Sequence, residues 1–174
     1  MGEIEVWRDI EGYGGKYQVS NKGRVQSFKR YRKGIVLKAN PSSSKYATVY
    51  LWQDNVKRNK TVHRLMLAAF PEHFIGNGCF VDHIDRDKLN NNLSNLRMCN
   101  KAQNSANTHK RKNTLSKYKG VCRCKTRWQA KVARRYIGLF KTEEEAAEAY
   151  NKEALKEFGE FANINIINRK QDWE

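Results

Sequence analysis

The sequence lacks most of what would mark it as a membrane, secreted or disordered protein. It has no apolar run of about 18 residues, the length of a transmembrane helix. Its first 15 residues lack the basic and apolar segments of a secretory signal. Two prolines among 174 residues argue against wholesale disorder. We therefore expect a folded chain made of one to three small modules.

Cysteine is also scarce, and the four cysteines form no CxxC pair. Their spacing fits no common zinc finger or zinc ribbon. Cys122 and Cys124 would lie on the same side of a strand, where a local disulfide would be strained. We expect all four to be reduced thiols in a cytoplasmic protein.

Acidic residues are outnumbered, with 18 Asp and Glu against 34 Lys and Arg and a net charge of +16. Eleven of the basic residues fall between Ser105 and Arg135, a stretch without Asp or Glu. Such charge favours a polyanionic partner. The basic residues do not form an amphipathic helix suited to a membrane surface. The composition therefore indicates nucleic acid and no membrane.

Residues 1–60 have the pattern of a small antiparallel β module. Alternating apolar residues flank a Gly-containing turn at residues 21–23, which predicts a hairpin. Residues 34–38 and 46–53 are two further expected strands, and residues 54–60 are expected to form a basic turn. The module offers these side chains to a nucleic-acid backbone: Lys16, Arg24, Lys29, Arg30, Arg32 and Lys33.

The middle of the chain, residues 61–107, predicts a helix over 62–70, two short strands around an Asn-rich loop, and a short helix after Asn100. Residues 108–117, THKRKNTLSK, are expected to be a basic linker.

Residues 118–168 predict three strands, over 118–122, 128–133 and 136–140, followed by one helix. Thr142 opens this helix with a capping-box sequence, and Gly159 is placed to end it. The apolar stripe of the helix must cover one face of the sheet.

Strand alternation then decides which side chains lie on the outer face of that sheet. On the second strand, Arg127 and Lys131 are expected to point outward. On the third strand, Tyr136 and Gly138 are expected outside, with Ile137 and Leu139 against the helix.

One group of residues has the chemistry of a hydrolytic site. Asp82 and His83 stand at the end of a short apolar strand, and Asn95 and Asn104 follow. Asp and Asn oxygens suit a hard metal ion, and histidine is the simplest general base near neutral pH. Adjacent strand residues point to opposite sides, so Asp82 and His83 can serve one centre only if the chain bends there.

Three sets of motifs resemble known families. The runs Val81–Asp85 and Asn90–Arg97 with the pair Gln103-Asn104 resemble the ββα-metal motif of HNH endonucleases of the phage homing type. Residues 7–25 resemble the N-terminal β module of that group, and residues 118–163 resemble an APETALA2-type DNA-binding domain. The implied fold is α+β: a β module (1–60), a ββα nuclease domain (61–107), a linker (108–117) and a three-stranded sheet packed on one helix (118–168).

The resemblance implies a role for each matching residue. Asp82 and Asn104 would bind the metal, His83 would activate water, and Asn95 would hold the loop and orient the histidine. Asn104 stands where many relatives have His, which favours Mg²⁺ or Mn²⁺. The implied function is that of a sequence-directed, homing-type endonuclease with a one-metal mechanism. It would nick one strand of double-stranded DNA per active site and leave 5′-phosphate and 3′-hydroxyl.

The resemblance also implies a setting and a set of DNA contacts. The setting is a monomer on DNA in the cytoplasm of a bacterial host, encoded by a phage or an intron. Arg suits guanine and Lys suits phosphate, so contacts are expected from the linker and the outer face of the last sheet. The expected contacts are Lys110, Arg111, Lys112, Lys119, Arg127, Lys131, Arg134 and Tyr136.

Several alternatives stay open. The chain could be a catalytically silent DNA-binding regulator, or a structure-specific or RNA-directed nuclease. Asn100 and Asn107 share a helix face with Asn104, and another Asn could take its place as metal ligand. Among the other histidines, His63 is expected to be structural, and His73 and His109 are expected to be solvated.

Overall fold

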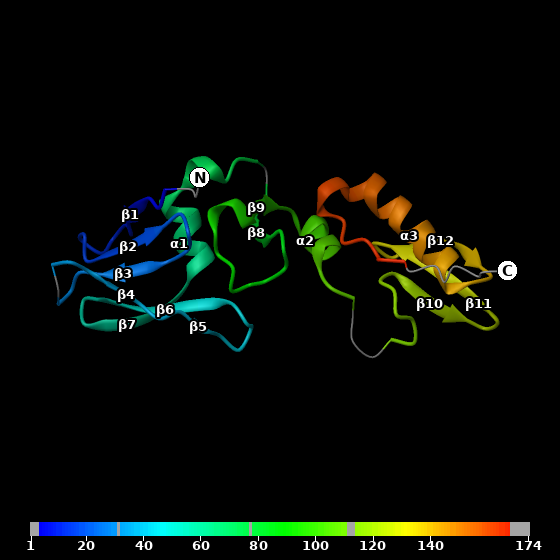
Figure 1. Ribbon diagram of the computed structural model, residues 1–174, viewed down its shortest axis with the longest axis horizontal. Coiled ribbons are helices and arrows are strands. Elements are labelled where there is room, and N and C mark those ends of the chain that lie inside the picture. The colour runs from blue at the N-terminus through cyan, green and yellow to red at the C-terminus, as the bar shows by residue number, and fades with distance from the viewer. Residues whose placement is uncertain (1–3, 31, 77, 111–113, 168–174) are drawn as a thin grey trace. The chain divides into compact units, whose positions relative to one another are not determined.

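A computed structural model describes residues 4–30, 32–76, 78–110 and 114–167. Two compact units meet in the chain between Asn100 and Lys101, and both combine antiparallel sheets with few helices (Figure 1). No helix among the described residues is long and apolar enough to cross a membrane. The first unit joins residues 1–60 to most of 61–107, so the four-part division by function remains a prediction.

The N-terminal part of the first unit contains two small sheets. One has the order β1-β2-β3-β4, and the other has the order β5-β6-β7. In the expected hairpin, β2 and β3 pair antiparallel with Val19 opposite Val25. The strands are β1 (Trp7–Asp9), β2 (Tyr17–Ser20), β3 (Val25–Ser27), β4 (Ile35–Val36), β5 (Asn40–Pro41), β6 (Ala47–Gln53) and β7 (Val56–Thr61).

The expected basic turn over residues 54–60 is wrong beyond its first two residues. Asp54 and Asn55 have φ angles of 50° and 61°, as in a two-residue hairpin turn. The chain then continues as β7, which pairs with β6 along its whole length. Most of β7 is polar and exposed, so it lacks the apolar alternation that marks a strand in a sequence.

The core of the first unit joins the N-terminal sheets to the strands that follow them. Helix α1 (Val62–Ala69) buries Met66 against sheet residues such as Val19 and Leu51, and the short turn η1 (Pro71–His73) follows it. Leu96 completes this core from β9 (Leu96–Cys99). Strand β9 pairs with β8 (Phe80–His83), and η2 (Leu93–Asn95) precedes β9 in the chain. The loop from β8 to β9 is therefore anchored at its C-terminal end by the core of the first unit.

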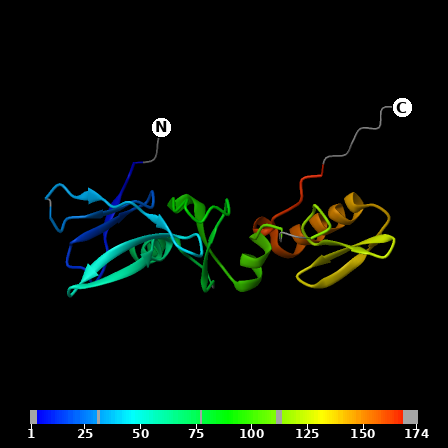
Figure 2. The same cartoon turned by 90° about the horizontal axis from the view of Figure 1, so that it is seen from below.

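The second unit has the expected sheet of three antiparallel strands with one helix along it, as Figure 2 shows. Thr142 and Glu145 form the expected capping box at the start of that helix. The elements are α2 (Lys101–Asn107), β10 (Val121–Cys124), β11 (Arg127–Val132), β12 (Arg135–Phe140), α3 (Glu143–Phe158) and η3 (Gly159–Phe161).

The register of β12 corrects one part of the predicted face assignment. A β-bulge interrupts its pairing with β11 between Ala130 and Lys131, and a bulge changes which residues of a strand share a face. Leu139 consequently lies opposite Gln129 and is 42% exposed. Gly138 lies opposite the buried Ala130, on the helix side. The expected positions of Leu139 and Gly138 were therefore exchanged.

Candidate active site and nucleic-acid interface

Strand β8 carries two adjacent polar residues into a buried setting. Asp82 and His83 are its last residues, with 5% and 4% of their surface exposed. Arg97, directly opposite Asp82 on β9, donates from Nε to Asp82 Oδ2 at 3.1 Å. A buried carboxylate needs such a partner, because leaving it unpaired away from water would be costly.

The His83 ring is held by Asn91, which is itself buried. His83 Nε2 and Asn91 Oδ1 are 3.3 Å apart, and Asn91 Nδ2 donates to Leu89 O at 3.0 Å. Since the amide nitrogen of Asn91 is used in this way, its oxygen faces the ring and accepts a hydrogen bond from a protonated Nε2. In the neutral ring, Nδ1 is then the basic nitrogen.

The surroundings of His83 keep its ring neutral. Burial lowers the pKa of His83; the hydrogen bond with Asn91 and the carboxylates of Asp82, Asp85 and Asp87 oppose this without cancelling it. The net pKa lies below the ordinary value of 6.5. The imidazole at neutral pH is therefore in the form that can accept a proton.

Asn95 closes the loop between β8 and β9. Its Nδ2 donates to Asp85 Oδ1 at 2.8 Å and to Asn90 O at 2.9 Å, and its Oδ1 accepts from Asp85 N at 3.0 Å. Burial would raise the pKa of Asp85, but hydrogen bonds from Asn90, Asn95 and the Asp87 amide outweigh it and lower the pKa. These bonds suit the loop-holding role implied for Asn95.

The structure shows a direct bond to the His83 ring from Asn91, whereas Asn95 bonds Asp85 and Asn90. The orienting role expected of Asn95 stays a prediction. Sequence reasoning did not identify Asn91. It stands in a run of three asparagines, 90–92, and nothing in that run indicates which side chain points inward.

Two further side chains pack around the His83 ring. The ring centroids of His63 and Tyr46 lie 5.6 and 6.0 Å from it, and Lys88 Nζ lies 4.2 Å from the centroid of Tyr46. Burial lowers the pKa of His63 to about 4, helped by the charges of His83, Arg64 and Lys88. His63 therefore adds no positive charge beside His83, and its packing fits the structural role expected from the sequence.

The N-terminal hairpin supports the same loop. Leu93 N donates to Asn21 O at 2.8 Å. Gly23, two residues after Asn21 in the same turn, has a φ of 71°. A Cβ built on it would lie 2.5 Å from Asn91 O. Only glycine allows this close approach. The turn between β2 and β3 thus packs directly against the residue that holds His83.

The predicted metal ligands lie in different units. Asp82 lies in the first unit with His83 and Asn95, whereas Asn104 is half-buried on α2 of the second unit. Among the described residues, no three His, Cys, Asp or Glu side chains gather as a metal cluster. The available donors are thus one carboxylate and amide oxygens. Mg²⁺ accepts such a sparse set of hard ligands, because waters and substrate phosphates complete its shell.

Two exposed basic residues of the second unit lie on the outer face of its sheet. Arg127 and Lys131 are exposed on β11, and Tyr136, opposite Lys131, is 53% exposed. Arg134 is exposed in the turn before β12, with a φ of 72°. Lys110 is half-buried. The predicted contacts Arg111 and Lys112 lie outside the described residues.

Lys119 differs from the other predicted contacts. Its Nζ donates to backbone carbonyls of residues 105, 106 and 108 at the end of α2. The structure thus assigns this ammonium to the protein's own backbone, not to the outer face of the sheet.

The first unit has a groove of about 670 Å³ lined by its two N-terminal sheets. Trp52 and Tyr50 expose 41% and 49% of their surface there. The Lys29 and Lys57 ammonium groups lie 5.2 and 4.2 Å from the centroids of these two rings, respectively. Exposed aromatic rings beside cations are common on nucleic-acid-binding surfaces. Sequence reasoning missed Lys57 because β7 was taken for a turn.

Two family models match the chain. Residues 5–52 match the NUMOD4 motif, and residues 60–106 match the model described as HNH endonuclease. We call residues 60–106, the part that matches this model, the HNH domain. This HNH domain contains Asp82, His83, Asn91 and the loop that Asn95 closes, and it extends into α2. In the chain, the HNH match therefore follows the NUMOD4 match after a short interval.

Relatives of the HNH domain occur in viruses. The uncharacterized HNH endonuclease L560 of Acanthamoeba polyphaga mimivirus is 40% identical over 112 residues, which cover 62% of this chain and 58% of the relative. DNA endonuclease I-HmuI of Bacillus phage SP01 is 41% identical over 91 residues, 52% of this chain and 50% of the relative. This chain thus spans about half the length of either relative.

A solved structure is similar to part of this chain. Its title is "DNA binding and cleavage by the HNH homing endonuclease I-HmuI". It superposes with a TM-score of 0.49 at 36% identity and covers 59% of this chain and 56% of that chain.

Proposed function

We propose that this protein is a sequence-directed DNA endonuclease of the homing type. It would hydrolyse a phosphodiester bond of double-stranded DNA, nick one strand per active site, and leave 5′-phosphate and 3′-hydroxyl ends. The observation that carries the proposal is the buried His83 of an HNH domain, kept neutral by burial and held at Nε2 by Asn91. A neutral, fixed imidazole is what a general base for water requires.

In this proposal the protein's own residues handle the proton. His83 Nδ1 accepts a proton from the attacking water, while Asn91 keeps the other ring proton in place at Nε2. Asn95 holds the loop closed around Asp85, so that the histidine does not drift from the phosphate. The departing 3′ oxygen takes a proton from solvent to become the hydroxyl, and the proton taken up by His83 is returned to solvent.

A divalent ion fits the donor set, and Mg²⁺ or Mn²⁺ is the proposed cofactor. Asp82 and Asn104 would hold it, with Asn100 and Asn107 as alternatives to Asn104. When bound, such an ion supplies positive charge at the phosphate and at the leaving oxygen. In one-metal chemistry of this kind, a single carboxylate with an amide oxygen is a sufficient protein contribution, because waters and the phosphate supply the remaining ligands.

DNA binding is proposed for both ends of the chain. The NUMOD4 region would use its aromatic and basic groove. The C-terminal module, residues 118–168, would act as an APETALA2-type domain through the outer face of its sheet, and the linker before it would follow phosphates. The proposed contacts there are Lys110, Arg111, Lys112, Arg127, Lys131, Arg134 and Tyr136.

Modules of different kinds laid along one duplex suit a monomer on an asymmetric site. The relatives in a Bacillus phage and in mimivirus support a gene of viral or intron origin. We place its action in the cytoplasm of a bacterial host.

The test uses supercoiled plasmid carrying random inserts. With Mg²⁺, the wild type should convert plasmid to the nicked form, and EDTA should stop the reaction. The variant His83→Ala should lose about 1,000-fold in rate, the usual size of general-base catalysis, and still bind DNA. The control His73→Gln changes an exposed histidine outside the loop and can keep its hydrogen bond to Leu96 O. Equal rates for wild type and His83→Ala would refute the proposal.

One observation favours the second candidate, a silent DNA-binding regulator. The Arg97 guanidinium holds Asp82 Oδ2, and an ion pair at a proposed metal ligand competes with a cation. A wild type that binds DNA tightly with Mg²⁺ present, yet never nicks any plasmid of the library, would establish the regulator.

A further inference from the structure

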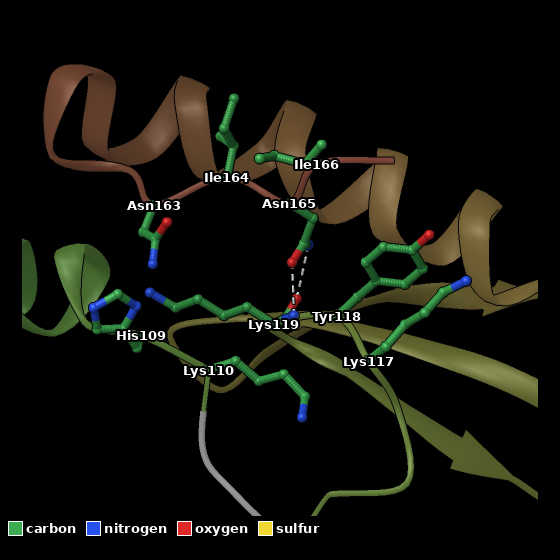
Figure 3. A pocket seen from close by; sticks show the side chains of 9 residues that line it. All are labelled: His109, Lys110, Lys117, Tyr118, Lys119, Asn163, Ile164, Asn165 and Ile166. Carbon is green, nitrogen blue, oxygen red and sulfur yellow. Dashed lines mark hydrogen bonds between the residues drawn. The ribbon is translucent and has the colours of Figure 1, made fainter. Parts of the chain in front are cut away.

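The C-terminal end of α2 is tied to the C-terminal module by a lysine. Figure 3 shows the Lys119 side chain extending toward the end of that helix. Its Nζ donates to Ala106 O, to Thr108 O at 2.7 Å and to Ser105 O at 3.5 Å. The last carbonyls of a helix have no partners within the helix. A cation placed there both bonds them and opposes the negative end of the helix dipole.

Asn163 makes a second connection to the same turn. Its backbone N donates to Ala106 O at 3.1 Å, and its side-chain Nδ2 donates to Thr108 O at 2.9 Å. Asn163 lies just after η3, so it joins α2 to the segment that follows α3. Two donors from Asn163 and one ammonium therefore converge on one helix end.

The residues that hold α2 are themselves fixed to the sheet and to α3. Asn165 Oδ1 accepts from Lys119 N at 2.7 Å, and Asn165 Nδ2 donates to Lys119 O at 3.0 Å, as the dashed lines in Figure 3 mark. The Asn151 side chain on α3 exchanges two hydrogen bonds, of 2.7 and 2.8 Å, with the backbone of Asn165. We name this set of contacts, made by Lys119, Asn151, Asn163 and Asn165, the α2 clamp.

We propose that Lys119 and Asn163 are positioning residues for Asn104. By fixing α2 to the C-terminal module, they make the proposed metal ligand move with the module that is proposed to grip DNA. The inference rests on the proposed function, because Asn104 has a role to play only if the domain holds a metal. It replaces the DNA contact first expected for Lys119, since an ammonium that bonds three carbonyls would have to leave them to reach a phosphate.

The first experiment tests the clamp itself by amide hydrogen exchange on the full chain. In Lys119→Met, peptides covering residues 101–108 should exchange about tenfold faster, the equivalent of losing one charged hydrogen bond. Lys119→Arg retains donors of the same charge and should restore slow exchange. Lys131→Met removes an equal charge from the outer face of β11 and should leave these peptides unchanged. Unchanged exchange in Lys119→Met would overturn the clamp.

The second experiment tests positioning through the metal requirement. The Mg²⁺ concentration for half-maximal nicking should rise about tenfold in Lys119→Met, while DNA affinity in EDTA changes less than about twofold. Asn163→Leu should behave similarly, and Lys119→Arg should recover. Lys131→Met should show the opposite pattern, with weaker binding and an unaltered Mg²⁺ requirement. A variant Lys119→Met with that opposite pattern would make Lys119 a DNA contact and overturn the inference.

Failure of the two proposals can be told apart. A wild type that never nicks DNA refutes the proposed function and removes any role for Asn104. The exchange comparison between Lys119→Met and Lys131→Met still decides whether the clamp exists.

Discussion

Two polar networks in this protein each hold a proposed site residue in place, but they differ in how far apart in the sequence their members lie. The loop network holds His83 through Asn91 and Asp85 through Asn95, so all its members lie within residues 82–95. The α2 clamp instead joins residues 105–108 to Lys119 and to residues 163–165. The first network is complete within one motif. The second requires a whole module to be folded, which makes the position of Asn104, the proposed metal ligand, dependent on the C-terminal sheet.

Among changes at the residues that support His83 and Asn104, breaking the loop network at Asn91 should have the largest effect. Asn91→Leu leaves His83 Nε2 without its acceptor, and nicking at saturating DNA should slow by about 100-fold, as expected for a misplaced catalytic group. Asn91→Asp keeps an oxygen at the same place and should retain most activity. Single-turnover rates with unchanged DNA affinity would check this. Equal rates for Asn91→Leu and wild type would show that the ring is held by other contacts.

The same network can be disturbed from outside through Gly23, and two matched glycines isolate the contact. Gly23 and Gly14 both have positive φ, but a Cβ on Gly14 meets nothing within 4 Å. Both Ala variants share the backbone strain, and only Gly23→Ala also pushes on Asn91. We expect Gly23→Ala to lower the free energy of unfolding by about 2 kcal/mol more than Gly14→Ala.

Denaturant titration of both glycine variants measures that difference. A nicking assay should show that Gly23→Ala, unlike Gly14→Ala, also slows the chemical step. Equal stability losses would mean that the hairpin turn does not support the loop.

The same division between local and distant contacts separates the features that the sequence predicted from those that it did not. The strands around the Asn-rich loop, the capped helix α3 and the outward Arg127 and Lys131 follow from periodicity and capping, which are local. The strand β7, the outward Leu139 and the contact of Lys119 do not. They depend on a partner strand, on a bulge and on the end of a distant helix, none of which leaves a pattern in nearby residues.

A smaller effect is expected from His63, which belongs to the packing around His83 and not to its hydrogen bonds. Its pKa is about 4 in the folded chain, against about 6.5 when unfolded. As pH falls below 6.5, the unfolded chain takes up a proton that folded His63 refuses, so stability is lost on acidification. Four side chains face this ring: Tyr46, His83, Arg64 and Lys88. The charges of His83, Arg64 and Lys88 oppose its protonation.

The measurement compares wild type with His63→Phe, which keeps an aromatic ring and cannot be protonated. Between pH 7 and pH 5, the wild type should lose about 1 kcal/mol more of its free energy of unfolding, a figure reduced for the partial exposure of the ring. Parallel pH profiles for the two proteins would mean that His63 is protonated as easily when folded as when unfolded.

The smallest effect is expected on the outer face of the C-terminal sheet, where neither network reaches. Lys131→Gln removes one exposed charge and should weaken DNA binding only about threefold, with a salt dependence shallower by about 0.9 in slope. Arg135→Gln is the matched control, because it removes an equal charge that is already paired within the protein. Arg135 Nη2 lies 3.1 Å from a carboxylate oxygen of Glu153 and of Glu157 on α3. Binding measured at several salt concentrations separates the two. If Arg135→Gln changes the salt slope as much as Lys131→Gln does, the charge of the module acts as a whole and the outer face is not the contact surface. If only Lys131→Gln changes the salt slope, the charges that act on DNA are the unpaired ones on the outer face. Those held by the α2 clamp or by ion pairs with α3 do not contribute.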